Sequence, residues 1–370
     1  MGLSTLRKKM TALFEQAVQE RIFPGAVAGV ALGGGEQRHT LVLAHGGLDY
    51  GEAPESMDLD VAFDLASLTK PFVTVLAILC LQKAGKLNLQ SPLSDLLGVA
   101  VGEDKAAIQL QHLLGHCSGL PAHQPYFSDL ASLPEGQRQD ALLKMILNEP
   151  LAYKMAEKAV YSDLGYILLG WIIENLSGHS LQDFMEQAVL TPLGLTNQIF
   201  FNPQNIPRPS RYAPTEECTW RRQLLIGQVD DDNCFAMGGV AGHAGIFGTM
   251  HGALGMACHL LDVVKGRVCH PNYYPQDLIQ LLSRQHLPEE TTWALGFDTP
   301  SGQGSSGGRH LSAQSFGHLG FTGTSFWLDP EKDLAMVLLT NRVHPSRENI
   351  KIRALRPLFH DLVVEELGMC

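Results

Sequence analysis

The hydrophobic positions of the chain fall into stretches with different periods. A spacing of three to four residues, typical of an amphipathic helix, occurs at the N-terminus and again over about Glu348–Leu367. A continuous apolar run, Pro71–Leu81, predicts a buried helix that begins near Ser67 and ends near Lys83. Serine is a residue type that often caps helix N-termini, so Ser67 is expected to cap this one.

Strand-like runs occur near both ends of the chain. They are bounded by Gly, Pro and Asp residues, and they predict the strands Ala26–Leu32, Thr40–Ala44, Ser315–Gly320, Thr324–Leu328 and Leu334–Thr340. Between them, the pattern predicts helices over about Gln137–Leu147, from Ser162 or Asp163 onward, over Leu181–Val189 and over Met250–Val264. Asn202–Cys234 is predicted to be a loop.

This order of elements predicts an α+β fold. The economical arrangement is one antiparallel sheet, built from both ends of the chain and flanked by the N- and C-terminal helices. We therefore expect a single domain with an α/β lobe, about residues 1–62 and 295–370, and an all-helical lobe, about residues 63–294. The active site is expected in the cleft between the two lobes.

Composition narrows the classes of function. The net charge of −11 over 370 residues argues against nucleic acid or an anionic membrane surface as a partner. No apolar run has the length of a membrane span, and the N-terminal basic residues precede no secretory signal. The seven cysteines form no C-x-x-C pair and are expected to be reduced thiols without a metal. We expect a cytoplasmic protein, or a periplasmic one if a signal has been removed.

Ser67 and Lys70 have the spacing and setting of a nucleophile and its base. Residues three apart on a helix share a face, so the amine and the hydroxyl can meet. A serine hydroxyl needs a neighbouring base, and apolar burial favours the neutral amine that can act as one. The N–H groups at the start of a helix suit a developing oxyanion.

Further motifs follow this pair in a recognisable order. They are Tyr161-Ser162-Asp163 and His318-Leu319-Gly320, accompanied by the stretches Leu113–Pro121, Gly165–Gly170, Pro192–Gly194, Gly238–Gly245 and Phe316–Ser325. With these motifs, the chain resembles the serine β-lactamase and penicillin-binding-protein superfamily. Within it, the chain is most similar to the class C β-lactamase-like serine hydrolases and esterases, from about residue 10 to 345. The resemblance implies a β-lactamase/transpeptidase-like fold.

The resemblance also implies a mechanism and its residues. Ser67 would become acylated, with Lys70 and Tyr161 sharing the proton relay, and water would then release the acid. The backbone N–H groups of Ser67 and Phe321 would form the oxyanion hole. A neighbouring ammonium favours the phenolate, so Lys70 and Tyr161 are expected to titrate as a pair. No cofactor is implied, and the substrate would be a small ester or amide.

Two positions depart from the pattern of this superfamily. Asp163 stands where an asparagine is common, and it either binds substrate or caps the following helix. His318 and Leu319 stand where other members have lysine and threonine. A histidine that is charged only part of the time and a leucine without a hydroxyl weaken recognition of a substrate carboxylate. With Gly320, Asp163 and His318 form the expected substrate-binding set.

Other candidate groups carry less weight. His112 and His116 have zinc-helix spacing but lack the glutamate of H-E-x-x-H. Asp230–Asn233 lacks the glycine and distal glutamate of a calcium loop, which favours a solvated loop. His243 either reaches the site or belongs to a structural glycine loop.

Three functions follow from these observations. The first is an esterase that acts on small or apolar acyl esters. The second is a β-lactamase or D,D-peptidase, and the third is a non-catalytic binding or regulatory homologue.

Overall fold

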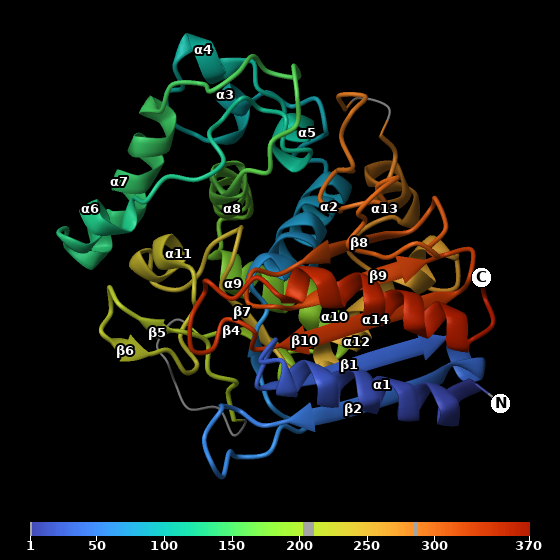
Figure 1. The fold of residues 1–370 in the computed structure, drawn as a ribbon. Helices are drawn as coiled ribbons and strands as arrows, with labels where there is room; N and C mark the ends of the chain where they lie inside the picture. Colours follow the sequence, from blue (N-terminus) through green and yellow to red (C-terminus); the bar gives the residue numbers. More distant parts are fainter. Residues whose placement is uncertain (1, 203–210, 285–286) are drawn as a thin grey trace.

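The computed structural model describes residues 2–202, 211–284 and 287–370. Its largest sheet has five strands in the order β2-β1-β10-β9-β8, with every neighbouring pair antiparallel (Figure 1). The strands are β1 (Gly25–Leu32), β2 (His39–Gly46), β8 (Phe316–Leu319), β9 (Ser325–Asp329) and β10 (Leu334–Thr340). Strands from both ends of the chain thus form one sheet, as the sequence predicts.

The two terminal helices cover one face of this sheet. Helices α1 (Gly2–Gln19) and α14 (Ile352–Glu366) lie against one another and against the strands (Figure 1). Alternate residues of β1, including Ala28 and Val30, pack with Phe14 and Phe359 in this layer. Val27 and Ala31 point to the opposite core. The two-residue period of the strand therefore divides its apolar side chains between two layers.

The opposite face is covered by α12 (Met250–Val264), which packs on β1, β9 and β10. Gly29 of β1 permits this close approach, because a Cβ there would lie 2.6 Å from Met250 Sδ. The expected division of the chain placed residues 250–264 in the helical lobe. The helix instead lies on the sheet, because both sheet faces are apolar and each needs a cover.

The helical lobe surrounds α8 (Asp163–Ser177), which is buried along most of its length and packs on α2 and α5. Ser162 caps it, since the Ser162 hydroxyl accepts the Gly165 N–H. The other helices of the middle segment are α2 (Leu76–Lys83), α3 (Leu93–Leu96), α4 (Glu103–Ala106), α5 (Leu110–Leu114), α6 (Phe127–Ala131), α7 (Glu135–Asn148), α9 (Leu181–Met185), α10 (Thr191–Leu193), α11 (Asp232–Ala236) and α13 (Pro275–Leu281).

Short strands also occur where the sequence predicted only helices and loops. A three-stranded sheet has the order β3 (Phe63–Asp64), β7 (Ile246–Gly248), β4 (Ile199–Phe201). A hairpin joins β5 (Glu217–Cys218) to β6 (Gln223–Leu224). Strands of two or three residues are too short to show an alternating pattern. Part of the predicted loop, residues 203–210, lies outside the described residues.

Among the described residues, one helical run has the length and composition of a membrane span. This run is Ala66–Lys83, and 83% of it is buried inside the protein. It forms the core between the helical lobe and the large sheet, and it carries the candidate nucleophile.

Candidate active site

Ser67 lies in a tight turn between β3 and α2. A 3₁₀ turn covers Ala66–Leu68, and a π-helical turn, Lys70–Val75, leads into α2. Ala66 has a φ of +47°, a conformation that costs a residue with a Cβ, and its N–H donates to Asp64 Oδ1 at 2.8 Å. The expectation that Ser67 caps the helix is wrong. The helical turn begins before Ser67, which leaves its hydroxyl free of any capping bond.

Lys70 is fully buried, and its Nζ has three acceptors. It lies 3.0 Å from Ser67 Oγ, 2.8 Å from Asp163 Oδ1 and 3.1 Å from the His243 carbonyl oxygen. Burial lowers the pKa of Lys70, but Asp163 and Tyr161 raise it by more, so its pKa lies above the usual value. Three acceptors satisfy the three N–H donors of an ammonium group. The resting site therefore holds a charged lysine and not the neutral amine that apolar burial alone would favour.

The Tyr161 ring lies beside Lys70, whose Nζ is 4.8 Å from the ring centroid. Burial raises the pKa of Tyr161, Lys70 lowers it and Asp163 raises it again, and the pKa ends above the usual value. We expected the neighbouring ammonium to favour the phenolate. Lys70 does act in that direction, but burial outweighs it, so the resting site holds a neutral phenol.

His116 holds the segment that carries Tyr161. Its carbonyl oxygen accepts the Val160 N–H at 2.9 Å, and its Nδ1 accepts the Ser162 N–H at 3.1 Å. Its ring lies on Tyr161, with the centroids 4.6 Å apart. The Nδ1 atom of His112, in contrast, accepts the N–H of Gln109, so the two histidines that have zinc-helix spacing bind separate backbone groups. His116 is thus a positioning residue that contacts three consecutive residues around the tyrosine.

Asp163 is the first residue of α8, and its side chain points at Lys70. The cap is supplied by Ser162, so the alternative that Asp163 caps the helix does not hold. Asp163 Oδ1 lies 2.8 Å from Lys70 Nζ, and Oδ2 lies 3.9 Å from His123 Nδ1. The carboxylate therefore acts on the charge of the lysine.

The turn after β8 is held against the segment that precedes Ser67. The Thr322 hydroxyl donates to the Asp64 carbonyl oxygen at 2.7 Å, and the Thr324 hydroxyl donates to the Leu65 carbonyl oxygen at 3.1 Å. A Cβ on Gly320 would lie 2.8 Å from the Leu65 oxygen, so only glycine permits this approach. These contacts bring the backbone of Phe321 next to the turn that carries the candidate nucleophile.

Two arginines fix the outer side of the same turn. Arg342 Nε donates to the Phe321 carbonyl oxygen at 2.9 Å, and Nη2 of Arg342 also bonds to it. Arg356 Nη2 donates to the carbonyl oxygens of Gly320 and Thr324, both at 2.8 Å. The peptide around Phe321 is therefore anchored through its carbonyl groups, which sets the direction of its N–H.

His318 lies behind the site and is 1% exposed. Its Nδ1 lies 2.8 Å from the Leu319 carbonyl oxygen, so Nδ1 carries the proton, and Nε2 has no hydrogen-bond partner among the described residues. Burial and Lys70 lower the pKa of His318 to about 3. The expectation of a partly charged histidine is therefore wrong: the ring is neutral at every physiological pH because it is buried beside an ammonium group.

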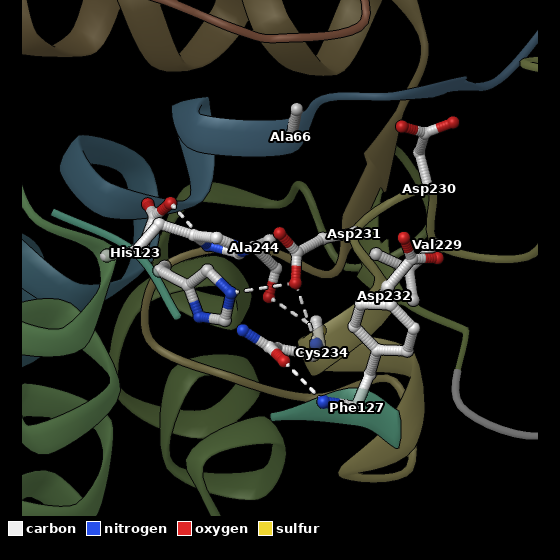
Figure 2. A network of polar contacts seen from close by, with 12 residues as sticks. Ala66, His123, Phe127, Val229, Asp230, Asp231, Asp232, Cys234 and Ala244 are labelled. Carbon is white, nitrogen blue, oxygen red and sulfur yellow. Dashed lines mark hydrogen bonds and ion pairs between the residues drawn. The ribbon is translucent and has the colours of Figure 1, made fainter. Parts of the chain in front are cut away.

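His243 joins the site through its backbone and its ring. Its Nε2 lies 3.0 Å from Asp231 Oδ1, and the same oxygen accepts the Cys234 N–H at 2.7 Å, in the network shown in Figure 2. Burial opposes the charge of Asp231, but His243 and Cys234 hold its pKa well below the usual value. The sequence analysis left His243 open, and its carbonyl oxygen proves to be a ligand of Lys70.

A cleft of about 710 Å³ opens beside these groups. Of the predicted residues, its lining includes Ser67, Tyr161, Asp163 and Phe321, and Lys70 lies beneath Ser67. The structure thus gathers the predicted nucleophile, relay and oxyanion residues at one cleft. His318 and Gly320 are not among the described residues that line the cleft. Aromatic rings pack over the side chain of His318, and Gly320 faces Leu65.

Comparison with known proteins gives the family. The sequence profile of the Beta-lactamase family matches residues 10–358. The chain belongs to the Beta-lactamase family. Two curated relatives of this family member are a putative D-alanyl-D-alanine carboxypeptidase of Salmonella enteritidis and an N-acetylmuramyl-L-alanine amidase of Bacillus subtilis. The first is 31% identical over 314 residues, 78% of this chain and 71% of the relative. The second is 32% identical over 353 residues, 87% of this chain and 78% of the relative.

Two solved structures with the same fold each align with nearly the whole of this chain. EstCE1, a hydrolase with promiscuous acyltransferase activity, has a TM-score of 0.73 at 21% identity and covers 97% of this chain and 98% of its own. The octameric penicillin-binding protein homologue from Pyrococcus abyssi has a TM-score of 0.72 at 20% identity and covers 99% of this chain and 79% of its own. The predicted α+β, β-lactamase/transpeptidase-like fold is confirmed. This Beta-lactamase family member is thus a serine hydrolase of β-lactamase and penicillin-binding-protein type.

Proposed function

We propose that the chain is an esterase that hydrolyses small or apolar acyl esters through an acyl-enzyme on Ser67. The observation that supports this most directly is the 3.0 Å separation of Ser67 Oγ and Lys70 Nζ at the edge of a cleft lined by Tyr161. In the proposed mechanism Ser67 is the nucleophile, and Lys70 and Tyr161 form the proton relay.

At rest the pair consists of the Lys70 ammonium and the Tyr161 phenol, and neither group can accept the Ser67 proton. Nucleophilic attack therefore requires the pair to have lost one proton. In that state the proton moves to the pair as Oγ bonds to the carbonyl carbon. The pair returns it to the leaving alcohol as the ester C–O bond breaks. Water then attacks the acyl-enzyme through the same relay, which releases the acid and restores the hydroxyl.

The N–H groups of Ser67 and Phe321 would stabilise the oxyanion during both steps. Support comes from the threonine hydroxyls of residues 322 and 324, which tie the two segments together. Preorganised donors of this kind are typically worth a factor of roughly 10²–10³ each in turnover. The arrangement needs no metal or cofactor.

The substrate class follows from the strand that would bind it. His318 is neutral and buried, and Leu319 has no hydroxyl, so the side chains of these two β8 residues offer neither a cation nor a donor to a substrate carboxylate. Substrates that carry a carboxylate at that point, as β-lactams and D-Ala-D-Ala ends do, lose the recognition found in other members. An ester without such a group needs none of it.

Amide hydrolysis is the second candidate. The relative from Bacillus subtilis, named an amidase of N-acetylmuramyl-L-alanine, matches 87% of this chain. The relay described above would serve an amide in the same way, by protonating the leaving amine. The L-alanine leaving group of such a substrate carries a carboxylate, for which the β8 side chains offer no cation, so the ester stays the first candidate.

The first test compares the wild type with Ser67→Ala on p-nitrophenyl acetate and butyrate. Turnover is expected to fall by about 10³-fold or more, because the substitution removes the nucleophile. Ser94→Ala is a matched control on an exposed serine and should keep wild-type turnover. A fluorophosphonate probe should label the wild type at residue 67. Equal ester turnover in the wild type and Ser67→Ala would contradict the proposal.

A substrate panel then separates the candidates. We expect the highest kcat/KM on the p-nitrophenyl esters, and little turnover of nitrocefin or of a peptide that ends in D-Ala-D-Ala. A higher kcat/KM on N-acetylmuramyl-L-alanine, abolished in Ser67→Ala, would favour the amidase. Stable labelling of Ser67 by penicillin would instead favour a penicillin-binding function.

A further inference from the structure

The cleft that holds Ser67 has acidic walls. Apart from Asp163, which pairs with Lys70, its lining includes the carboxylates of Glu216, Glu217, Asp230, Asp231, Asp232 and Glu348. Among the lining residues in the described part of the chain, Arg347 is the sole arginine, and no lysine is present. A cleft lined by one sign of charge concentrates ligands of the opposite sign.

The arginines near these carboxylates are already engaged. Arg347 donates two hydrogen bonds of 2.6 Å to Glu216 and one of 3.3 Å to Asp232. Arg221 donates to Asp232 at 2.8 Å, and its other bonds go to the carbonyl oxygens of Val229 and Asp230. These pairs leave negative charge on the wall without a matching cation.

Of the buried carboxylates in this lining, Asp230 has the weakest hydrogen-bonding and ionic contacts. Its residue is 2% exposed, and among the described residues neither Oδ1 nor Oδ2 makes a close hydrogen bond, although the Thr215 hydroxyl lies near enough to lower its pKa. Arg347 Nη2 approaches Oδ2 only to 4.0 Å. In Figure 2 no contact line reaches this carboxylate, which lies apart from the network around Asp231. A buried carboxylate with so few contacts is costly, and burial raises its pKa to about 7, so a cation bound beside it would stabilise the charged form.

Aromatic side chains lie on the same lining. Phe127 and Trp220 pack edge to face, with ring centroids 4.7 Å apart. Arg221 connects them to the acidic wall, because its guanidinium lies 5.5 Å from the Trp220 ring and bonds to the Asp230 carbonyl oxygen at 2.8 Å. Carboxylates beside aromatic rings form the environment that binds organic ammonium groups.

We propose that the substrate carries an organic ammonium group, which binds between the Asp230 carboxylate and the Phe127–Trp220 pair while its carbonyl lies at Ser67. This inference rests on the proposed acyl hydrolysis and names the charge of its substrate. It is consistent with β8, which offers no cation to an anionic substrate. The ammonium would supply a close cationic partner for Asp230.

The test compares esters that differ only in charge. One pair is butyrylcholine and its uncharged isostere, in which a tert-butyl group replaces the trimethylammonium group of the leaving alcohol. The other is p-nitrophenyl trimethylammoniobutyrate and the p-nitrophenyl ester in which a tert-butyl group replaces the trimethylammonium group, so that the difference lies on the acyl group. We expect kcat/KM to favour the cationic member of at least one pair by about tenfold. High salt should reduce that preference, since it screens exposed charges.

Substitutions test whether the preference for cationic esters depends on the acidic side chains that line the cleft. Asp230→Asn keeps the shape and removes the charge, so it should abolish most of the preference while the uncharged ester is hydrolysed at close to the wild-type rate. Glu331→Gln, on an exposed turn far from the cleft, is the matched control and should keep the preference. Should Asp230→Asn fail to fold, Trp220→Leu tests the aromatic part of the same site.

The outcomes distinguish the two proposals. Equal kcat/KM for both members of both pairs, in an enzyme that hydrolyses them through Ser67, overturns the ammonium site and leaves the esterase intact. Absence of any Ser67-dependent hydrolysis overturns the esterase. In that case calorimetric titration of Ser67→Ala with choline and with its tert-butyl isostere decides the ammonium site: tighter binding of choline supports it, and equal or no binding overturns it.

Discussion

The Lys70 ammonium and the Asp163 carboxylate meet at 2.8 Å in a site where a neutral amine would be the better base. The pair stabilises the protonated lysine, and burial keeps Tyr161 in its phenol form. At the scale of single residues, the chain therefore sets the relay to lose its proton only at high pH. We expect the proposed hydrolysis to increase toward alkaline pH.

Asp163→Asn tests this coupling. The amide removes the charge that raises the pKa of Lys70, so the limb of the profile on which kcat/KM rises with pH should move to lower pH by about one unit. Activity near neutral pH should increase as a result. Asp183→Asn, on an exposed helix, provides the control. An unchanged profile in Asp163→Asn would show that the lysine does not belong to the relay.

Some of these residues could be predicted from the sequence and others could not. Ser67 and Lys70 could be predicted from spacing and an apolar run, because both signals are local. The contact of Asp163 with Lys70 spans 93 positions. No local pattern could therefore choose between a helix cap and a place in the site. The support that His116 gives to Tyr161 was missed for the same reason, and its conformation at φ +57° has no sequence signal outside glycine.

At the scale of elements, the turn after β8 and the turn before α2 behave as one unit. Thr322 is buried, and its hydroxyl bonds to the Asp64 carbonyl oxygen at 2.7 Å. The bond fixes the distance between the two proposed oxyanion donors, on Ser67 and Phe321. A change in this contact should therefore act on the transition state more than on substrate binding.

Thr322→Val tests that linkage with nearly the same side-chain shape. Loss of the hydrogen bond should lower kcat by about tenfold and leave KM within about twofold, because a displaced N–H donor affects chiefly the transition state. Thr11→Val, on the exposed face of α1, is the matched control and should keep both constants. An effect on KM alone would instead assign Thr322 to substrate binding.

The periodicities predicted the long elements well and the short ones poorly. Strands β1, β2 and β10 and helices α1, α12 and α14 have clear apolar patterns. The π-helical turn Lys70–Val75 has the same composition as an ordinary helix, so its extra residue per turn could not be predicted. The hairpin β5–β6 is too short for any pattern and was predicted as a loop, although Glu217 and Cys218 of β5 help to line the cleft.

At the scale of the whole molecule, two buried carboxyl groups link stability to pH. Burial raises the pKa of Asp64 to about 6, and burial, with Asp64 and Glu216 adding to it, raises the pKa of Asp230 to about 7. An unfolded aspartate titrates near 3.9. Between about pH 4 and 7 the folded state thus binds more protons, so these groups lower the stability as pH rises, and the cost is complete above pH 7.

Asp230→Asn should therefore raise the melting temperature at pH 8, by about 2 °C, and by less at pH 5, where Asp230 is protonated in the folded protein. Thermal unfolding of the two proteins at both pH values measures this difference. Glu331→Gln, which is exposed, should show no such dependence. A variant that is less stable than the wild type at pH 8 would show that the charge of Asp230 stabilises the fold.

The two threonine bonds between the β8 turn and residues Asp64 and Leu65 also determine how the molecule can flex. They join the turn after β8 of the large sheet to the segment before Ser67, and they hold the proposed nucleophile close to the proposed oxyanion donor of Phe321. Tyr161 belongs to another segment, just before α8, and lines the same cleft as Ser67. A shift of the segment before α8 would therefore change the position of Tyr161 relative to Ser67, whereas the two proposed oxyanion donors would keep their separation.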